Sequence, residues 1–219
     1  PKNEDFAYVE YQGGNLARVT QSTGETKLIR PLERAGEPKY RFNWNAPIHL
    51  SPTDEGTLYL GAQFLFRSRD RGDSWERISP DLTTNDPAKQ RQDESGGLTL
   101  DDSTAENHCT IFAIAESPKS RDVIWVGTDD GNLQLTKDGG KSWTNVVANV
   151  PRLPKHAWVT SVAASRFAEG TAYVTFDHHM LGDMKPYVYK TADFGASFVA
   201  LSGGELRGFA HVVKEDLVN

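Results

Sequence analysis

The chain has 219 residues, of which 37% are hydrophobic and 25% are charged, so it can bury a core and is not expected to be disordered. A net charge of −6 argues against broad nucleic-acid binding, which needs a positive surface. The apolar runs have the length of single β-strands, so none of them predicts a membrane-spanning helix. The single cysteine, Cys109, excludes an internal disulfide.

Short runs of β-branched and aromatic residues, each ended by Gly, Pro, Asp or Ser, predict strands along the whole chain. The first group, FAYVEYQ, NLARVTQ and TKLIRP, falls within residues 1–32 and reads as the later part of a four-stranded blade. Groups of four runs follow at residues 45–80, 108–150 and 156–202. A last run, FAHVVKED, within residues 208–216 resembles only the first strand of a further blade. The sequence therefore predicts an all-β chain with about four blades of four antiparallel strands.

An eight-residue pattern, [ST]-x-D-x-G-x-S-[WF], occurs at residues 68–75, 136–143 and 191–198. An Asp carboxylate can accept hydrogen bonds from the backbone N–H groups that follow it, and Gly supplies a positive φ, so the pattern predicts a tight hairpin turn. The hydroxyl residue adds a local hydrogen bond, and the aromatic residue covers the turn with apolar area. We interpret the matching residues as structural rather than catalytic: Ser68, Asp70, Gly72, Trp75, Thr136, Asp138, Gly140, Trp143, Thr191, Asp193, Gly195 and Phe198.

These turns resemble the Asp boxes, or bacterial neuraminidase repeats, of sialidases, sortilin-type receptors and several glycoside hydrolases. The runs RFNWNAPIHLSP, SRDRGDSWERISPDLTTND and VIWVGTDDGNLQLTKDGGKSWTNV are most similar to large bacterial sortilin-like proteins, often labelled glycosyl hydrolases. The resemblance implies a β-propeller, which is much larger in that family than this chain, and a secreted or periplasmic location. We therefore expect a partial propeller. The alternative is a closed ring of four blades. In such a ring, residues 209–215 would pair with the sheet that contains residues 7–11.

Strand direction predicts where a binding site lies. In a four-stranded meander, the links between strands one and two and between strands three and four lie at one end of the blade, which we call the Asp-turn end. The other links lie at the opposite end, the loop end, and they include the long insertion at residues 80–107 and the link at residues 177–185. Loops longer than about 12–15 residues are usually functional or disordered. We expect the binding site at the loop end. We also expect residues 86–97 to be the most mobile internal stretch of the chain, because they are polar and lack aromatic side chains.

Acidic and imidazole side chains supply the candidate groups at the loop end. They are Asp101, Asp102, Glu106, His108, Asp129, Asp130, Asp177, His178, His179 and Asp183. The last four could hold a divalent ion, and the first three could act as paired carboxylates, but solvated side chains are the preferred interpretation of both groups. Asp129 and Asp130 are interpreted as part of a tight turn. His108 and Cys109 are not expected to form a catalytic pair, because adjacent residues of a strand point to opposite faces. No metal and no cofactor is predicted.

The sequence favours a non-catalytic propeller that recognises a protein, peptide or other ligand, as sortilin-type receptors do, because the scaffold signal is abundant and no catalytic set can be assigned. The alternative is a glycoside hydrolase module related to the sialidases, although no set of arginines and acids that would bind and cleave a sialoside stands out. The expected partners are an unidentified protein, peptide or glycan ligand, and the remaining blades of a larger chain or other subunits. Neither nucleic acid nor membrane insertion is expected.

Overall fold

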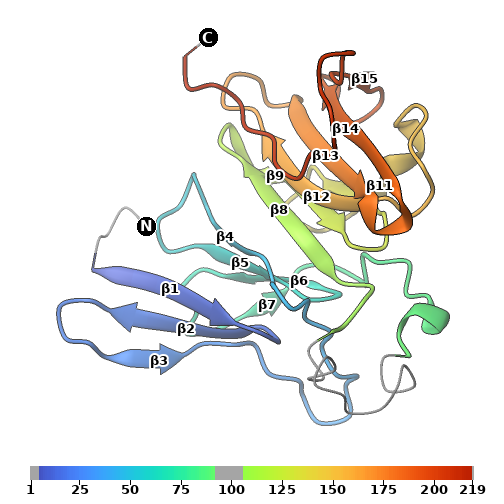
Figure 1. Cartoon of the computed structure of the whole chain (residues 1–219). Helices are drawn as coiled ribbons and strands as arrows, with labels where there is room; N and C mark the ends of the chain where they lie inside the picture. Colours follow the sequence, from blue (N-terminus) through green and yellow to red (C-terminus); the bar gives the residue numbers. More distant parts are fainter. Residues whose placement is uncertain (1–4, 92–105, 219) are drawn as a thin grey trace. The chain divides into compact units, whose positions relative to one another are not determined.

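The computed structural model describes residues 5–91 and 106–218, and its regular structure there is antiparallel β-sheet with a few short 3-10 helices. The chain divides into two compact units, Pro1–Ile111 and Phe112–Asn219, which are considered separately below (Figure 1). Within the described residues, no helix has the length and apolar character needed to cross a membrane.

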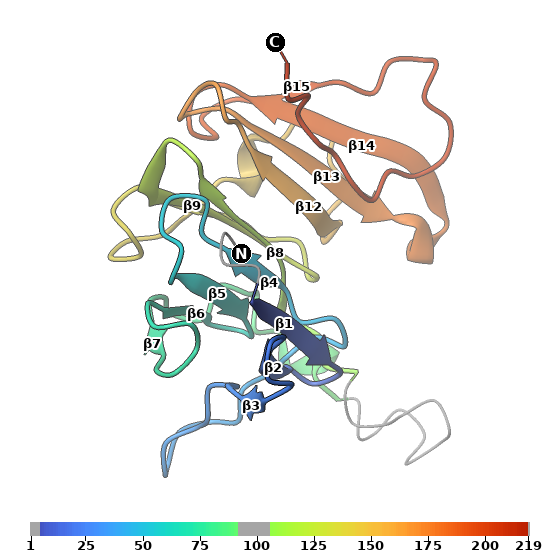
Figure 2. The ribbon, with the colours of Figure 1, turned by 90° about the vertical axis from the view of Figure 1, so that its left-hand side faces the viewer.

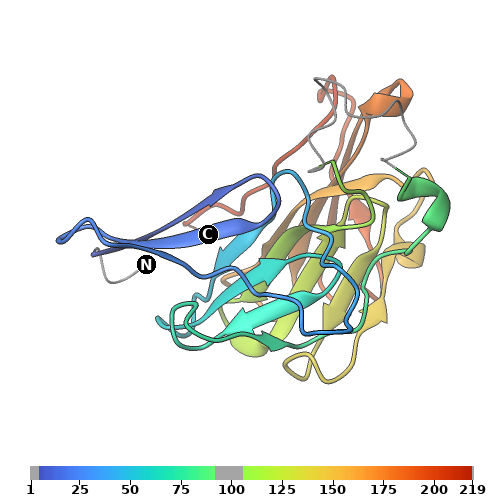
Figure 3. The ribbon, with the colours of Figure 1, turned by 90° about the horizontal axis from the view of Figure 1, so that it is seen from below.

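Unit 1 contains two sheets, one of three strands and one of four, each a meander in chain order. Their strands are β1 (Phe6–Tyr11), β2 (Asn15–Thr20) and β3 (Thr26–Leu28), then β4 (Ile48–Leu50), β5 (Leu58–Gly61), β6 (Leu65–Ser68) and β7 (Glu76–Arg77). The 3-10 helix η1 (Pro87–Lys89) lies on the chain that follows β7 (Figure 3). The core between the two sheets includes Leu16, Phe42 and Leu60, which are almost completely buried.

Unit 2 contains two four-stranded sheets, again in chain order. Their strands are β8 (Ile111–Ser117), β9 (Ser120–Thr128), β10 (Leu133–Thr136) and β11 (Thr144–Asn145), then β12 (Trp158–Ala164), β13 (Ala172–His178), β14 (Asp183–Thr191) and β15 (Val199–Ala200). The 3-10 helices are η3 (Val147–Asn149) and η4 (His179–Leu181). Trp125, Val159 and Phe176 belong to one continuous core that joins the two sheets. The all-β prediction, with its short antiparallel strands, is confirmed.

The three repeated turns adopt one hydrogen-bond pattern, seen in its first copy between β6 and β7. Ser68 Oγ accepts from the backbone N–H of Gly72 (2.7 Å) and donates to Asp70 Oδ1 (2.8 Å). Asp70 also accepts from the backbone N–H and the hydroxyl of Ser74, at 2.8 and 2.6 Å. The same bonds recur in the second and third copies. Hydrogen bonds to the charged carboxylate, above all from the serine hydroxyl, lower the pKa of Asp70 and of Asp138 to about 2 and also lower that of Asp193.

The first and third turns also fasten their blade to the one before it. Gly72 has φ +92°, and a Cβ at this position would lie 2.3 Å from Ile29 Cδ1, so only glycine fits against the preceding sheet. The indole Nε1 of Trp75 donates to the carbonyl oxygen of Ile29 at 2.5 Å. In the third turn, the carbonyl oxygen of Gly195 accepts from Asn149 Nδ2, which lies beyond the preceding sheet (2.8 Å). The turns thus stabilise the packing of neighbouring blades as well as their own hairpins.

The C-terminal segment, which the sequence predicts as a strand at residues 208–216, forms no strand in the structure. Thr175 of β13 donates its hydroxyl to the carbonyl oxygen of His211 (3.1 Å), and Glu215 accepts from Ser165 Oγ (2.6 Å) and from the backbone N–H of Arg166 (2.8 Å). These isolated bonds do not make a ladder, which requires a partner strand in register. The segment instead crosses the sheet β12–β15 from its loop end to its Asp-turn end (Figure 2). Among the described residues, β1 pairs with β2 alone.

Candidate functional site

The link between β9 and β10 lies at the loop end of its blade and carries Asp129 and Asp130, which are both buried. Asp130 Oδ1 accepts from the hydroxyl of Thr128 at 2.5 Å, and the backbone N–H of Asn132 donates to the same hydroxyl oxygen (2.8 Å). Gly131 supplies the positive φ of +100° that the turn needs. Asp130 therefore acts here as a turn-forming acceptor.

The link between β13 and β14 brings three side chains together at the loop end of the last blade. Asp177 is the penultimate residue of β13 and is almost completely buried, with a side chain that is 1% exposed. Its Oδ2 lies 2.5 Å from Nδ1 of His179, the first residue of η4, and 3.3 Å from Nε2 of His211 in the C-terminal segment. Its Oδ1 accepts from the backbone N–H of His179 (2.8 Å). We call Asp177, His179 and His211 the His–Asp cluster.

The other two candidates of this link lie apart from that cluster. Asp183 Oδ2 accepts from the hydroxyl of Tyr187 at 2.6 Å. This bond and the partial burial of the ring raise the pKa of Tyr187 to about 12, while the same bond lowers the pKa of Asp183. His178 and Asp183 line a cavity of about 770 Å³ together with Met184 and Arg207. Sequence reasoning grouped His178 and Asp183 with Asp177, whereas the structure places His211 beside Asp177 instead.

The remaining candidates belong to the end of the long insertion in unit 1. Asp101 and Asp102 lie outside the described residues, as do residues 92–97 of the segment expected to be mobile. Glu106 and His108 are half-buried and precede β8. The neighbouring Cys109 is fully buried at φ +60°, in irregular backbone rather than in a strand as the sequence predicts. Arg41 Nε donates to the carbonyl oxygen of Cys109 at 3.3 Å.

An exposed aromatic ring lies near this anchoring point. Trp44, in the link between β3 and β4, is 43% exposed. Its neighbour Asn43 is buried and donates through Nδ2 to Thr110 Oγ1 (3.0 Å), and Asn107 Nδ2 donates to the carbonyl oxygen of Phe42 (2.9 Å). The ring is therefore presented to solvent next to Phe42 and Asn43, which are held by these hydrogen bonds.

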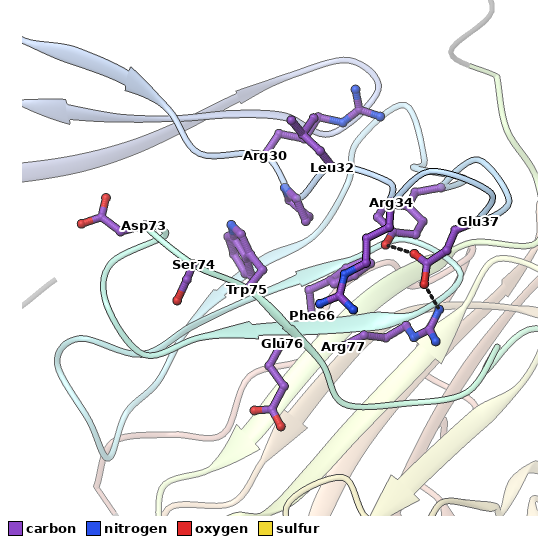
Figure 4. Close-up of a pocket in the computed structure, with 12 residues that line it drawn as sticks. Arg30, Leu32, Arg34, Glu37, Phe66, Asp73, Ser74, Trp75, Glu76 and Arg77 are labelled. Carbon is purple, nitrogen blue, oxygen red and sulfur yellow. Dashed lines mark hydrogen bonds and ion pairs between the residues drawn. The ribbon is translucent and has the colours of Figure 1, made fainter.

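A cavity of about 620 Å³ in unit 1 lies between the segment after β3 and strand β7 (Figure 4). Within it, Glu37 Oε2 accepts from the hydroxyl of Tyr40 (3.0 Å), and Glu37 Oε1 lies 3.8 Å from Arg77 Nη1. Trp75 lines the same cavity with a ring whose N–H is bonded to Ile29. Because the carboxylate of Glu37 and the indole of Trp75 already have partners within the chain, we describe the cavity as a joint between neighbouring blades.

Two functional residues were missed by sequence reasoning. His211 is separated from Asp177 by more than thirty residues, and it stands in a run that the sequence predicts only as a strand. Phe209 stacks on the imidazole of His179, with ring centroids 4.3 Å apart and planes inclined by 16°. No local spacing signals either contact, because both depend on how the C-terminal segment crosses the last sheet.

Comparison with known proteins places the fold. No protein-family model matches the chain. An oligoxyloglucan-reducing end-specific xyloglucanase from Emericella nidulans is 27% identical over an alignment of 164 residues, and the match covers 71% of this chain and 17% of that protein. The crystal structure of an ancestral GH74 enzyme superposes with a TM-score of 0.57 at 16% identity, covering 92% of this chain and 23% of the other. A GH74 xyloglucanase from Xanthomonas campestris gives a TM-score of 0.55 at 17% identity, covering 95% and 31%.

These matches confirm the fold that the repeats predict, because the superposed structures are β-propellers. The chain spans less than a third of the length of each of these relatives. They also support the glycoside hydrolase alternative better than the sortilin-like interpretation that the sequence favoured. The chain is a set of blades with a glycoside hydrolase-like β-propeller fold.

Proposed function

We propose that this chain is part of a secreted, glycoside hydrolase-like propeller and that it binds a β-glucan polysaccharide of the xyloglucan class at its loop end. The observation that carries the proposal is the similarity to the Emericella nidulans xyloglucanase over 164 residues. The fold neighbours agree with it, since structures of GH74 enzymes superpose on more than nine-tenths of the chain.

The exposed ring of Trp44 is the proposed platform for the sugar. Flat aromatic rings pack against the apolar faces of sugars and give binding area at low entropic cost. Trp44 is partly exposed at the loop end of its blade, and the hydrogen bonds of Asn43 and Asn107 hold the backbone around it. An aromatic ring that is already fixed in place loses little freedom on binding.

Cleavage needs two carboxyl groups on opposite sides of the glycosidic bond. In unit 2, Asp130, Asp177 and Asp183 each accept a hydrogen bond from a neighbour within the chain. We therefore propose that this chain binds polysaccharide. We assign none of its residues as the acid or the base of a hydrolysis.

Three finer points belong to the same proposal. The repeated turns are Asp boxes, because each has the residue pattern and the same carboxylate-centred hydrogen bonds. The four sheets correspond to blades near residues 1–32, 45–80, 108–150 and 156–202. Residues 208–216, which form no strand in this structure, would become the first strand of a further blade once its other strands are present, because they already run from the loop end to the Asp-turn end, as a first strand does. The partners would then be a glycan and further blades or subunits.

Affinity electrophoresis of the chain in gels containing xyloglucan, with a β-1,3-glucan gel for comparison, tests the proposal. We expect retardation by xyloglucan, and a loss of about tenfold in affinity for Trp44→Ala, as for an aromatic hot spot. Phe167→Ala is the matched control, because Phe167 is also 43% exposed but lies at the Asp-turn end. Release of reducing ends from xyloglucan would add catalysis to the proposal. Equal migration in all gels would contradict the proposal and favour recognition of a protein or peptide.

A further inference from the structure

The His–Asp cluster brings together three side chains that can each ligate a metal ion. The three atoms able to ligate a metal, one carboxylate oxygen and two imidazole nitrogens, lie within 4.8 Å of one another. They come from three different places: the end of β13, the first residue of η4 and the C-terminal segment. Both imidazoles are directed at the same oxygen, Oδ2 of Asp177.

The cluster is held in place by a surrounding layer of contacts. The backbone N–H of His179 occupies Asp177 Oδ1, so the carboxylate presents its other oxygen to the two rings. Phe209 stacks on the ring of His179 and packs its edge against His211, with centroids 4.9 Å apart. The hydroxyl of Thr175 donates to the carbonyl oxygen of His211, and this bond holds the backbone of His211 in place. Such supporting contacts orient metal ligands and strengthen metal binding.

Two imidazoles and one carboxylate are a ligand set for zinc and related transition-metal ions, whereas calcium and magnesium take oxygen ligands. In a tetrahedral zinc site with bonds of about 2.0–2.1 Å, two ligand atoms lie about 3.3 Å apart. The 3.3 Å between His211 Nε2 and Asp177 Oδ2 matches that edge. The 2.5 Å between His179 Nδ1 and Asp177 Oδ2 is a hydrogen bond, which an ion between the two atoms would replace.

The cluster is open on one side. The side chains of His179 and His211 are 31% and 46% exposed, whereas that of Asp177 is 1% exposed. An ion can therefore enter from solvent, have one of its two positive charges balanced by the buried carboxylate, and keep one position for water. Burying the charged carboxylate of Asp177 costs free energy unless a positive charge lies beside it. A bound cation would supply that charge.

We propose that Asp177, His179 and His211 bind a divalent ion of the zinc class, and that this ion fastens the C-terminal segment to the loop end of the last blade. The ion would join β13 and η4 to residues that are otherwise held by isolated hydrogen bonds. This site is independent of the polysaccharide proposal, because it involves neither Trp44 nor any other residue of unit 1.

Isothermal titration of the chelator-treated 219-residue chain with ZnCl₂, and separately with MgCl₂, tests the site. We expect one Zn²⁺ bound per chain, no comparable binding of Mg²⁺, and a rise in melting temperature with Zn²⁺ that EDTA reverses. Limited proteolysis should show that Zn²⁺ protects the chain after Leu201.

Three variants distinguish Zn²⁺ binding at the His–Asp cluster from Zn²⁺ binding to histidines elsewhere on the surface. His211→Ala should lose at least about 100-fold in Zn²⁺ affinity, and because His211 lies in irregular, half-exposed chain, the fold should be kept. Asp177→Asn should lose affinity to a similar extent. His178→Ala is the matched control, since this adjacent histidine is outside the cluster, and it should bind Zn²⁺ as the unchanged chain does.

Three results would overturn the proposal: no Zn²⁺ binding by the chain, undiminished binding by His211→Ala, or an equal loss in His178→Ala. The first would mean that the cluster is a hydrogen-bonded His–Asp pair and nothing more. If Asp177→Asn does not fold, His211→Ala and its conservative counterpart His211→Gln decide the question alone.

Discussion

The two ends of the same blades find their polar partners in different ways. At the Asp-turn end, the carboxylate of Asp193 takes its side-chain partners from Thr191 and Ser197, all within one eight-residue pattern. At the loop end, the carboxylate of Asp177 takes one partner from His179 and another from His211. A local network can form as soon as its hairpin forms, whereas the loop-end cluster exists only after the C-terminal segment has crossed the sheet. We therefore expect changes at the Asp-turn end to alter stability and changes at the loop end to alter binding.

Gly72→Ala should have the largest effect on stability. The added Cβ would lie 2.3 Å from Ile29 Cδ1 at a φ of +92°, so the variant combines overpacking with backbone strain and should cost about 2–4 kcal/mol. Gly24→Ala is the control for φ alone, because Gly24 has φ +72° with nothing within 4 Å, and it should cost about 1 kcal/mol. Urea unfolding of both variants measures the difference. Equal costs would show that the contact between the first turn and Ile29 does not hold the blades together.

Gly195→Ala should have a smaller effect on stability than Gly72→Ala. The added Cβ would lie 3.0–3.2 Å from Cγ2, Cβ and Cγ1 of Val146, a milder overlap than the 2.3 Å at Gly72, and the φ of Gly195 is +78°. We expect a cost of about 1–2 kcal/mol in the same unfolding measurement. A cost above that of Gly72→Ala would mean that the third turn, and not the first, is the tighter junction.

Asp138→Asn should weaken the fold near neutral pH and not in strong acid. The ordinary pKa of 3.8 falls to about 2 in the folded chain, mainly through the hydroxyl of Ser142. A lowered folded-state pKa means that the carboxylate contributes stability above about pH 4, and that this contribution is lost as the pH falls toward 2. The melting temperatures of the variant and the unchanged chain should therefore converge over that range. Burial lowers the pKa of His49 to about 4, but that loss of stability begins at higher pH and is common to both proteins.

Ser142→Ala is the partner variant of that experiment. It removes the hydroxyl that donates to Asp138 Oδ2 at 2.6 Å and leaves the backbone donor of the same residue in place. We expect a weaker form of the same pH dependence. If the difference between Asp138→Asn and the unchanged chain stayed constant down to pH 2, the turn would not depend on the charge of its carboxylate.

Trp44→Ala should have the smallest effect on stability, within about 0.5 kcal/mol, because its ring is partly exposed and lies outside the buried core. Its effect should appear in polysaccharide binding instead. Thermal unfolding recorded on the samples used for electrophoresis separates the two quantities. A large drop in melting temperature would assign Trp44 to the scaffold and remove it from the proposed binding surface.

The sequence by itself was sufficient for the all-β fold, the strand groups and the three repeated turns. These features depend on interactions between near neighbours: alternating apolar residues, turn residues, and an Asp that bonds to the residues following it. In the structure, Asp70, Asp138 and Asp193 each accept hydrogen bonds from residues of the same turn.

Only the tertiary structure decided which groups meet at the loop end. Asp177, His178, His179 and Asp183 look equivalent in the sequence, yet Asp183 bonds to Tyr187 while Asp177 is joined by His211. The long, irregular C-terminal segment has no ladder to specify its path, so its side-chain contacts follow from packing against a sheet formed elsewhere in the chain. Local periodicity carries no information about such contacts, because their separation along the chain is set by the path of a loop and not by the repeat of a helix or a strand.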